Sequence, residues 1–289
     1  MKKTNTALAY AKLNVSLDIV SKMANGYHNM KMVMQAVSLS DEITVDCVPG
    51  EGVRIRAGLP YLPGDERNIA VKAARAFFKH TGIYGYRTSI AINKNIPVGA
   101  GLGGGSSDGA CVLRMLDDMF DTGIGREKLE EIGSTIGSDV PFCIAGGTTL
   151  AEGRGEKLTD LPALPECYIV ICKPPFAFST PALFKRIICD RISARPDTDG
   201  IIAALNNNDL IGVARRMYNV FEDVLPRGSI DIADIKYAML DYGALGAVMT
   251  GSGPAVFGFY DDEVCAIESH QRLKERYKEC FLAVPIGKI

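Results

Sequence analysis

The sequence predicts an α+β protein, and three observations lead to that prediction. Apolar and polar side chains alternate strictly over residues 7–20, as expected of a β-strand. The glycine-rich segment 96–110 connects a second alternating stretch to a helical pattern. From residue 168 onwards the patterns follow the order strand, helices, strand, strand, helix, strand, which is typical of a split βαβ layer.

Turn residues and apolar periodicity divide the first half into strands and helices. Asp65 is a candidate cap for one helix and Gly82 is its stop. A proline near the first helical position predicts a helical turn that begins within Gly137–Pro141. The other expected elements are strands at 7–20, 30–39, 42–48 and 52–57, a helix at 65–80, a strand at 86–95, helices at 106–119 and 126–136, and a strand at 146–151.

Pro162 and Pro165 mark the expected boundary between the two halves. We therefore predict a first domain over residues 1–160 and a second over 161–289. The second is expected to contain a strand at 168–172, helices at 180–192, 197–205, 208–218 and 229–242, strands at 246–250 and 255–260, a helix at 262–277 and a last strand.

Composition narrows the class of protein. The 289 residues are 47% hydrophobic and 23% charged, which suits one large globular domain or two closely packed ones. A formal net charge of −2 argues against nucleic acid as the main partner. Polar residues interrupt the N-terminal apolar stretch, so we expect a cytoplasmic protein with no membrane partner. Eight irregularly spaced cysteines and three scattered histidines predict reduced core thiols rather than a zinc site.

The first strand carries an unusual polar face. Its apolar residues, Ala9, Ala11, Leu13, Val15, Leu17 and Ile19, are expected to share one side. The other side would present Lys12, Asn14, Ser16 and Asp18. This side either faces solvent or forms the wall of a polar cleft, and alternation alone does not decide between the two.

The glycine run is the strongest functional signal in the chain. Glycine lets consecutive backbone N–H groups converge on one anion, and a helix expected to begin at about Ser106 would direct its positive end to the same place. We therefore predict a phosphate-binding loop. A Walker A loop is excluded because no lysine occurs between Lys94 and Lys128. Gly99, Gly101 and Gly104 match a dinucleotide fingerprint, but the second strand with its acidic end is missing. A flexible turn is the remaining alternative.

Seven segments resemble the motifs of the GHMP kinase superfamily, small-molecule kinases that use backbone amides in place of the Walker A lysine. They span almost the whole chain in the superfamily's order. They are Ala11–Leu17, Asn25–His28, Leu39–Ile43, the glycine run, Gly137–Phe142, Gly146–Gly153 and Thr250–Pro254. The resemblance implies the GHMP kinase fold, with an N-terminal nucleotide-binding domain of ribosomal-S5-like topology packed against a C-terminal ferredoxin-like domain.

The resemblance also implies an activity. It implies ATP-dependent phosphorylation of a hydroxyl, with ATP and Mg²⁺ as cofactors and metal ligands that we do not assign. Lys-Leu-Asn followed by Gly-Tyr-His is similar to the branch that acts on methylerythritol linked to cytidine diphosphate, in the non-mevalonate route to isoprenoid precursors. With this small molecule as its partner, we expect the protein to be a monomer or a weak homodimer.

The superfamily's functional positions can be carried over residue by residue. The catalytic pair falls on Lys12 and Asp139, where aspartate would accept or orient the hydroxyl proton and lysine would balance charge. The nucleotide-binding positions fall on Pro97, Val98, Gly99, Ala100, Gly101, Leu102, Gly103, Gly104, Gly105, Ser106, Ser107, Asn68 and Lys94. The substrate-binding positions fall on Asn14, Tyr27, His28, Thr180 and Phe184. Tyr27 would stack on the cytosine, His28 would bond its edge and Phe184 would form the opposing wall.

Each of these positions also has a purely structural interpretation. Asp139 could cap the helical turn that begins at Val140, and Lys12 could be a surface lysine. Ser106 or Ser107 could cap a helix, and Asp108 could brace the loop. The other structural alternatives are a helix-end amide at Asn68, a surface lysine at Lys94, a turn tyrosine at Tyr27, a core phenylalanine at Phe184 and a tight turn at Gly251 and Gly253.

Two residues depart from the usual pattern of the branch, and the sequence disfavours two other functions. Asn25 stands where aspartate is usual and Tyr10 where proline is common, and neither removes a group that the chemistry needs. A relative that phosphorylates homoserine or mevalonate is disfavoured by the tyrosine–histidine pair. An inactive relative that only senses a ligand is disfavoured because Lys12 and Asp139 are both retained.

Overall fold

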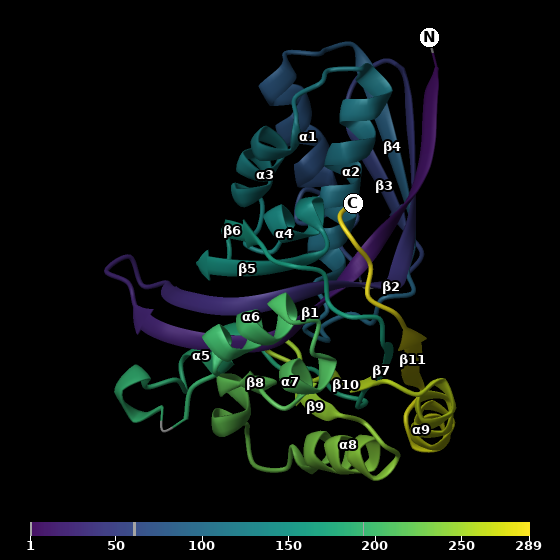
Figure 1. Ribbon diagram of the computed structural model, residues 1–289. Coiled ribbons are helices and arrows are strands. Elements are labelled where there is room, and N and C mark those ends of the chain that lie inside the picture. Colours follow the sequence, from purple (N-terminus) through teal and green to yellow (C-terminus); the bar gives the residue numbers. More distant parts are fainter. Residues whose placement is uncertain (1, 60–61, 193) are drawn as a thin grey trace.

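Two β-sheets organise the chain, and helices cover one face of each (Figure 1). The computed structural model describes residues 2–59, 62–192 and 194–289. The two sheets meet in the middle of the molecule, where β1 and β2 of the first lie against the inner face of the second. The α+β class is confirmed.

The first sheet is built on a long antiparallel hairpin. Its strand order is β3-β4-β2-β1-β8, and β5 pairs with β2 and with β6. Its strands are β1 (Lys3–Lys22), β2 (His28–Pro49), β3 (Val53–Ala57), β4 (Tyr86–Asn93), β5 (Thr148–Gly153), β6 (Lys157–Asp160) and β8 (Tyr218–Asn219). The expected break between strands 30–39 and 42–48 is wrong, because Ser40 and Asp41 continue the ladder opposite Tyr10 and Ala9. The patterns also missed β6 and β8.

Bulges in β1 redistribute its side chains. The β1–β2 register shifts between Tyr10 and Lys12, between Asn14 and Ser16, and between Ile19 and Ser21. Each shift inserts an unpaired residue and turns the following side chains to another face. The prediction of one apolar face is therefore wrong. Ala11, Leu13 and Val15 lie in the core under the second sheet, whereas Ala9, Leu17 and Ile19 lie in the core cluster that includes the helices.

The polar residues of β1 do not face solvent. Lys12, Asn14, Ser16 and Asp18 are all buried, with at most 8% of their surface exposed. Burying polar groups costs free energy unless they find partners. Lys12 and Asn14 line a cavity, as the cleft alternative predicted, whereas Ser16 and Asp18 are bonded to Val33 and Arg195.

Four helices pack on the first sheet: α1 (Ile69–Thr81), α2 (Gly104–Phe120), α3 (Arg126–Ser134) and α4 (Val140–Ala145). Asp65 is not the cap of α1, because Asn68 accepts the N–H of Ala70 while Asp65 accepts that of Arg67. Gly82 ends α1 in a left-handed conformation, as predicted. Helix α2 begins at Gly104, two residues before the expected start, so Gly104 and Gly105 form its first turn.

The second sheet confirms the split βαβ layer. Its strands are β7 (Tyr168–Lys173), β9 (Gly246–Met249), β10 (Val256–Tyr260) and β11 (Glu279–Ala283), in the antiparallel order β11-β7-β10-β9. Helices α8 (Ile230–Asp241) and α9 (Glu263–Arg276) cover its outer face. Alternation along the strands gives each sheet face its own core, so Ile169 and Ile171 pack toward β1 while Val170 and Cys172 pack toward the helices.

The segment between β7 and α8 departs most from expectation. It contains α5 (Thr180–Phe184), a 3₁₀ turn (Cys189–Arg191), α6 (Thr198–Asn206), α7 (Leu210–Ala214) and a second 3₁₀ turn (Val220–Val224). The predicted helix 180–192 ends at Phe184, and Arg195 then ties the chain to β1 through Asp18 and the carbonyl of Ile19. The predicted helix 208–218 ends early because Tyr218 and Asn219 join β1 as β8. Tertiary pairing overrides helical propensity in both places.

The remaining expectations concern cysteines and membranes. All eight cysteines are free in the structure; six of them are buried, as expected of core residues, whereas Cys189 and Cys265 are half-buried. Across residues 2–59, 62–192 and 194–289, no helix combines the length and apolar character needed to cross a membrane.

Candidate active site

Lys12 and Asp139 meet in one cavity although 127 positions separate them in the chain. The Nζ atom of Lys12 lies 3.8 Å from Oδ2 of Asp139 and donates to Oδ1 of Asn14 at 2.6 Å. The lysine side chain is 5% exposed and the aspartate side chain 32% exposed. Lys12 is therefore not a surface lysine. It is a buried cation whose positive charge is directed at an open carboxylate.

Helix α4 fixes the backbone of Asp139 but does not use its side chain. The carbonyl of Asp139 accepts the N–H of Cys143 at 3.1 Å, which anchors the residue to the first turn of α4. Its carboxylate makes no capping hydrogen bond. The interpretation of Asp139 as a side-chain cap is therefore wrong, and both carboxylate oxygens remain available to a ligand.

The glycine run passes close to backbone at Gly101 and to a buried side chain at Gly103, so there is little room for a side chain at either position. A Cβ atom on Gly101 would lie 2.2 Å from the carbonyl oxygen of Thr250, and one on Gly103 would lie 2.8 Å from Cγ of Lys12. Both glycines have positive φ. In the described part of the chain, the backbone N–H groups of residues 98–106 donate to no protein acceptor. These donors and the positive end of α2 are thus available to an anion.

A second glycine loop, Thr250–Pro254, packs against the first. The N–H of Ala255 donates to the carbonyl of Ala100 at 3.1 Å, and a Cβ atom on Gly251 would lie 3.1 Å from Nζ of Lys12. Asn219 holds this loop in place by donating to the carbonyl of Gly251. The backbone at Gly251 therefore lies against the first loop and against Lys12.

The remaining hydroxyl and amide positions divide into bound and open groups. Ser107 donates to the carbonyl of Tyr10 at 2.6 Å, which joins α2 to β1. The hydroxyl of Ser106 makes no hydrogen bond within the described residues and lines the cavity beside the loop. Asn68 caps α1, so the interpretation as a helix-end amide holds. Neither serine is the N-cap of α2, because Gly103 occupies that position.

Lys94 is buried in a cluster of charges beneath the loop. Its ammonium group donates to Asp41 and, at 2.9 Å, to Oδ2 of Asp108. The surface-lysine alternative is therefore wrong. Asp41 also accepts the N–H groups of Asn95 and Ile96, while Oδ1 of Asp108 is buried without a partner. Burial raises the pKa of Asp108 to about 7, with the charge of Asp41 adding to the rise and Lys94 opposing it.

Three cavities form a continuous row. The central cavity, of about 230 Å³, contains Lys12, Asn14 and Asp139. It shares Gly99, Gly101 and Gly103 with the loop cavity, of about 320 Å³, and shares Thr180 and Phe184 with the hairpin cavity, of about 940 Å³. The loop cavity is further lined by Asn68, Lys94 and the glycine run, and the hairpin cavity by Tyr27 and His28.

The aromatic residues of the hairpin cavity differ in their surroundings. The rings of His28 and Phe184 stack at 4.9 Å and 22°, and Phe184 meets Phe221 edge-on. Tyr27 is 55% exposed, with the guanidinium of Arg154 5.4 Å from its ring. Burial, and then the charge of Lys22, lowers the pKa of His28. Phe184 is therefore neither a free wall nor a fully buried core residue.

Sequence reasoning missed several residues that build the site. Asp41, Asn219 and Thr250 are buried polar residues, and Thr250 accepts the N–H of Asn14 at 3.0 Å. Asp41 and Thr250 lie in segments that resemble superfamily motifs, and that resemblance is the available signal. Asn219 had no such signal because its role depends on β8 pairing with β1.

Comparison with known proteins identifies relatives along the whole chain. Residues 68–147 match the family model described as GHMP kinases N terminal domain, and residues 201–279 match that described as GHMP kinases C terminal. A 4-diphosphocytidyl-2-C-methyl-D-erythritol kinase from Clostridium botulinum is 43% identical over 277 residues, covering 95% of this chain and 97% of that protein. The enzyme of the same name from Clostridium beijerinckii is 42% identical over 274 residues, with the same coverage.

Solved structures agree on the fold. The crystal structure of a 4-(cytidine 5'-diphospho)-2C-methyl-D-erythritol kinase has a TM-score of 0.83 and 28% identity, covering 98% of this chain and 100% of that one. A homoserine kinase from Cytophaga hutchinsonii has a TM-score of 0.77 at 21% identity, covering 100% of this chain and 96% of that one, and shows a shared fold alone.

We expect Gly101→Ala to destabilise the protein and weaken nucleotide binding, because its Cβ would strike the carbonyl of Thr250 at a residue with positive φ. The strained backbone alone should cost about 1–3 kcal/mol. Gly105→Ala is the matched control, because its Cβ would meet only Ile69, at 3.5 Å. Chemical denaturation of both variants tests this, and equal stabilities would contradict it.

The charge cluster predicts a pH dependence of stability. The native pKa of Asp108 is about 7 and lies above its value in the unfolded state. Between these two pKa values the native state therefore binds more protons than the unfolded state. The stabilising contribution is complete at pH below the unfolded pKa and is lost as pH rises through about 7. We expect Asp108→Asn to flatten this part of the profile in unfolding experiments from pH 4 to 8. An unchanged slope would show that Asp108 titrates normally.

Proposed function

We propose the roles of these residues from the premise that the chain belongs to the 4-diphosphocytidyl-2-C-methyl-D-erythritol kinases, a branch of the GHMP kinases. The chain is a small-molecule kinase. It uses ATP to phosphorylate the 2-hydroxyl of 4-diphosphocytidyl-2-C-methyl-D-erythritol in the non-mevalonate route to isoprenoid precursors.

One observation supports the proposed catalytic centre most strongly. Lys12 and Asp139 occupy the central cavity, which lies between the loop cavity and the hairpin cavity. With ATP in the loop cavity, the nucleotide end of the substrate would occupy the hairpin cavity. Its reacting hydroxyl would then reach the central cavity. The two reactants would then meet beside the charged pair.

Asp139 and Lys12 would act on the attacking hydroxyl. Asp139 accepts its proton as the oxygen forms a bond to the γ-phosphorus, and the bond from that phosphorus to the bridging oxygen of ADP breaks. Lys12, with its Nζ 3.8 Å from the carboxylate, offsets negative charge at the transferring group. Asn14 holds the ammonium through its side-chain oxygen at 2.6 Å. The free N–H groups of the loop stabilise charge on the phosphates.

The loop also fits a magnesium ion carried by ATP. Mg²⁺ keeps several waters and binds phosphates with few protein ligands. No cluster of three or more acidic, histidine or cysteine side chains suited to a metal occurs within the described ranges. Ser107 donates to Tyr10, and Asp108 is bonded to Lys94 through Oδ2 while its unpartnered Oδ1 is buried; the open hydroxyl of Ser106 is the proposed protein ligand. When bound, the ion would neutralise phosphate charge.

The hairpin cavity is the proposed site of the cytosine. The exposed ring of Tyr27 offers one face for stacking, and Arg154 occupies the neighbourhood of the other. His28 stacks on the ring of Phe184, and its pKa lies below the usual value, which favours the neutral ring that can both donate and accept. Thr180 lies where this cavity joins the central one.

A substrate panel tests the assignment as a whole. Purified protein with Mg-ATP should release ADP with the cytidyl substrate and not with homoserine or mevalonate. Turnover of homoserine or mevalonate alone would select a different kinase branch. Binding of the cytidyl substrate without any turnover would select a sensor.

Asp139→Asn should lower kcat by roughly 10²-fold or more and leave ATP affinity nearly unchanged, because it removes the proton acceptor without altering the loop. Asp261→Asn, an exposed aspartate in the turn before α9, is the control and should retain full activity. Steady-state kinetics and ATP titration measure both effects. Full turnover by the Asp139 variant would remove this residue from the mechanism.

Tyr27→Ala should raise KM for the cytidyl substrate far more than KM for ATP, since stacking on a base is worth about 1–3 kcal/mol. Tyr84→Ala is the matched control because Tyr84 is a still more exposed tyrosine outside the three cavities. Equal increases in both KM values would refute the stacking role.

A further inference from the structure

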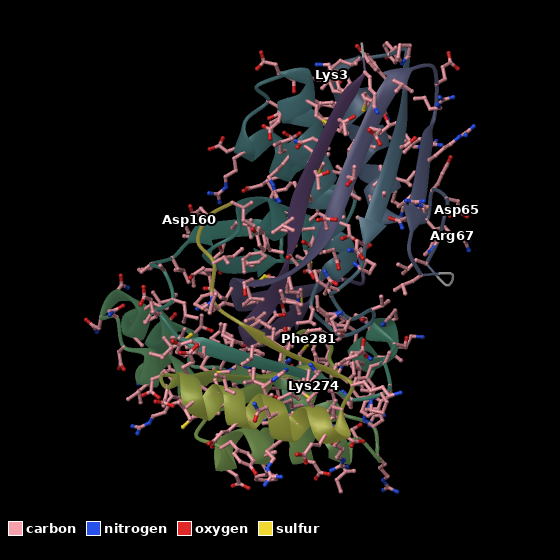
Figure 2. The ribbon with its side chains drawn as sticks, turned by 90° about the vertical axis from the view of Figure 1, so that its right-hand side faces the viewer. Lys3, Asp65, Arg67, Asp160, Lys274 and Phe281 are labelled. Atoms are coloured by element: carbon pink, nitrogen blue, oxygen red, sulfur yellow. The ribbon has the colours of Figure 1, made fainter. Side chains whose placement is uncertain are left out.

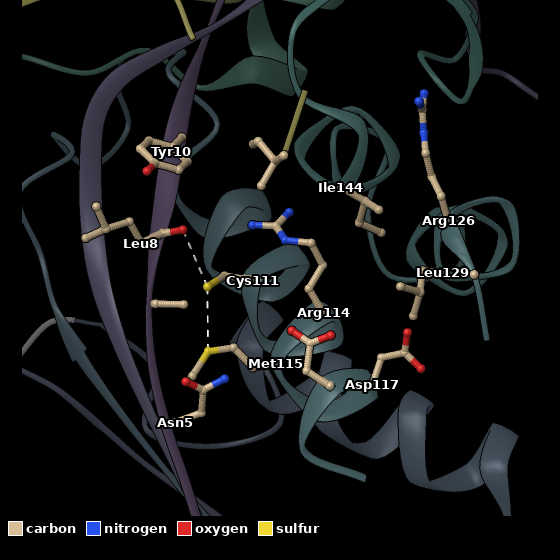
Figure 3. Close-up of a pocket in the computed structure, with 14 residues that line it drawn as sticks. Asn5, Leu8, Tyr10, Cys111, Arg114, Met115, Asp117, Arg126, Leu129 and Ile144 are labelled. Atoms are coloured by element: carbon tan, nitrogen blue, oxygen red, sulfur yellow. Dashed lines mark hydrogen bonds between the residues drawn. The ribbon is translucent and has the colours of Figure 1, made fainter. Parts of the chain in front are cut away.

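A fourth cavity lies apart from these three, beside β1 and α2. It occupies about 500 Å³ between β1 and α2, with α3 and α4 beside it, and we name it the β1–α2 cavity (Figure 3). Its volume is in the range of small-molecule sites. It shares no lining residue with the central, loop or hairpin cavities. Its occupant would therefore be distinct from both substrates.

One charge in this cavity lacks a counter-ion. The guanidinium of Arg114 donates to the carbonyl of Cys143 at 2.6 Å, and no carboxylate of the described residues lies within ion-pair distance of it. Figure 3 shows the side chain extending away from Asp117, with the guanidinium in the space between Cys111 and Ile144. The other charged side chains of the wall are bonded or exposed, and the C-terminal residue Ile289 also lines the cavity. Asp117 accepts from Thr122 and Ile124, Arg126 is paired with Glu130 and Asp160, and Asp118 is exposed.

The rest of the wall is apolar. Met115, Leu129 and Ile144 line the cavity with their side chains, as Figure 3 shows, whereas Leu8 contributes its backbone carbonyl. Cys111 is also apolar in effect, because burial raises the pKa of its thiol to about 11 and keeps it neutral. Guanidinium groups bind carboxylates and phosphates strongly through paired N–H donors. We propose that the β1–α2 cavity is a second ligand site, which takes a small molecule with one anionic head on Arg114 and an aliphatic body against these walls.

The cavity is connected to both members of the catalytic pair. The carbonyl of Cys143 accepts from Arg114, and the N–H of the same residue donates to the carbonyl of Asp139 at 3.1 Å. On the other side, Tyr10 lines the cavity two residues before Lys12. A ligand that draws the guanidinium from Cys143 therefore acts on α4, which carries Asp139. The ligand site stands without the proposed function, and this coupling to catalysis rests on it.

The binding test uses hexanoate and hexyl phosphate as probes, with 1-hexanol and inorganic phosphate as controls that lack the head or the body. Methyl NMR signals of Met115, Leu129 and Ile144 should shift saturably with the two probes and not with the controls. Arg114→Met should weaken binding at least tenfold, whereas Arg126→Met, the ion-paired arginine of the same cavity, should not. Ala7→Leu, which narrows the cavity without changing its charge, should weaken binding even if Arg114→Met fails to fold.

The kinetic test uses the same probes on the full chain. A saturating probe should change kcat about fivefold with KM for ATP unchanged, and the change should disappear in Arg114→Met. Competition with ATP or with the cytidyl substrate would overturn the proposal, as would the absence of methyl shifts or equal binding by Arg114→Met. Binding that leaves kcat unchanged would overturn the coupling alone. Methyl shifts remain measurable in a protein that shows no kinase activity, so failure of the proposed function is a separate result.

Discussion

The contact between two glycine loops is the constraint on which the site depends. The backbone of Gly101 lies against the carbonyl of Thr250 so closely that a Cβ would approach it to 2.2 Å. This contact joins the two halves of the molecule, because Lys12 belongs to the first sheet and the loop Thr250–Pro254 connects two strands of the second. Lys12 lies between the loops and against Gly103, so its ammonium can point in few directions. The loop is held in place through its own carbonyl oxygens, which accept N–H groups from other residues. Its own N–H groups therefore remain open.

Buried polar groups support this arrangement from below. Asp41 bonds two backbone N–H groups at the start of the glycine run and shares the ammonium of Lys94 with Asp108. Figure 2 shows how many of the chain's charged groups lie at the surface instead, where Asp65, Arg67 and Lys274 project into solvent. Surface pairs contribute little, whereas a buried pair that loses one partner is strongly destabilising. The buried cluster therefore restricts where the loop can lie.

Sequence patterns predicted most elements and failed where polar residues or tertiary partners decided. Strong periodicity located α1, α9 and the strands β7, β9 and β10 to within a few residues, and it predicted the last strand without bounds. The break assigned near Ser40 was wrong because β1 supplies a ladder partner for each polar residue there. The long helices assigned after Thr180 and before Tyr218 were wrong because ties to β1 replaced helical hydrogen bonds. A pattern records propensity and contains no information about a partner far along the chain.

The sequence by itself determined the fold class, the strand-to-helix position of the glycine run and, through its resemblance, the identity of Lys12 and Asp139 as candidates. Those features are local, because glycine conformation, apolar periodicity and residue type are properties of a few neighbouring positions. Only the tertiary structure decided that the polar face of β1 is buried, that Asp139 leaves its carboxylate uncapped and that Lys94 is enclosed by two carboxylates. Each of these depends on distances between residues that the chain brings together only on folding.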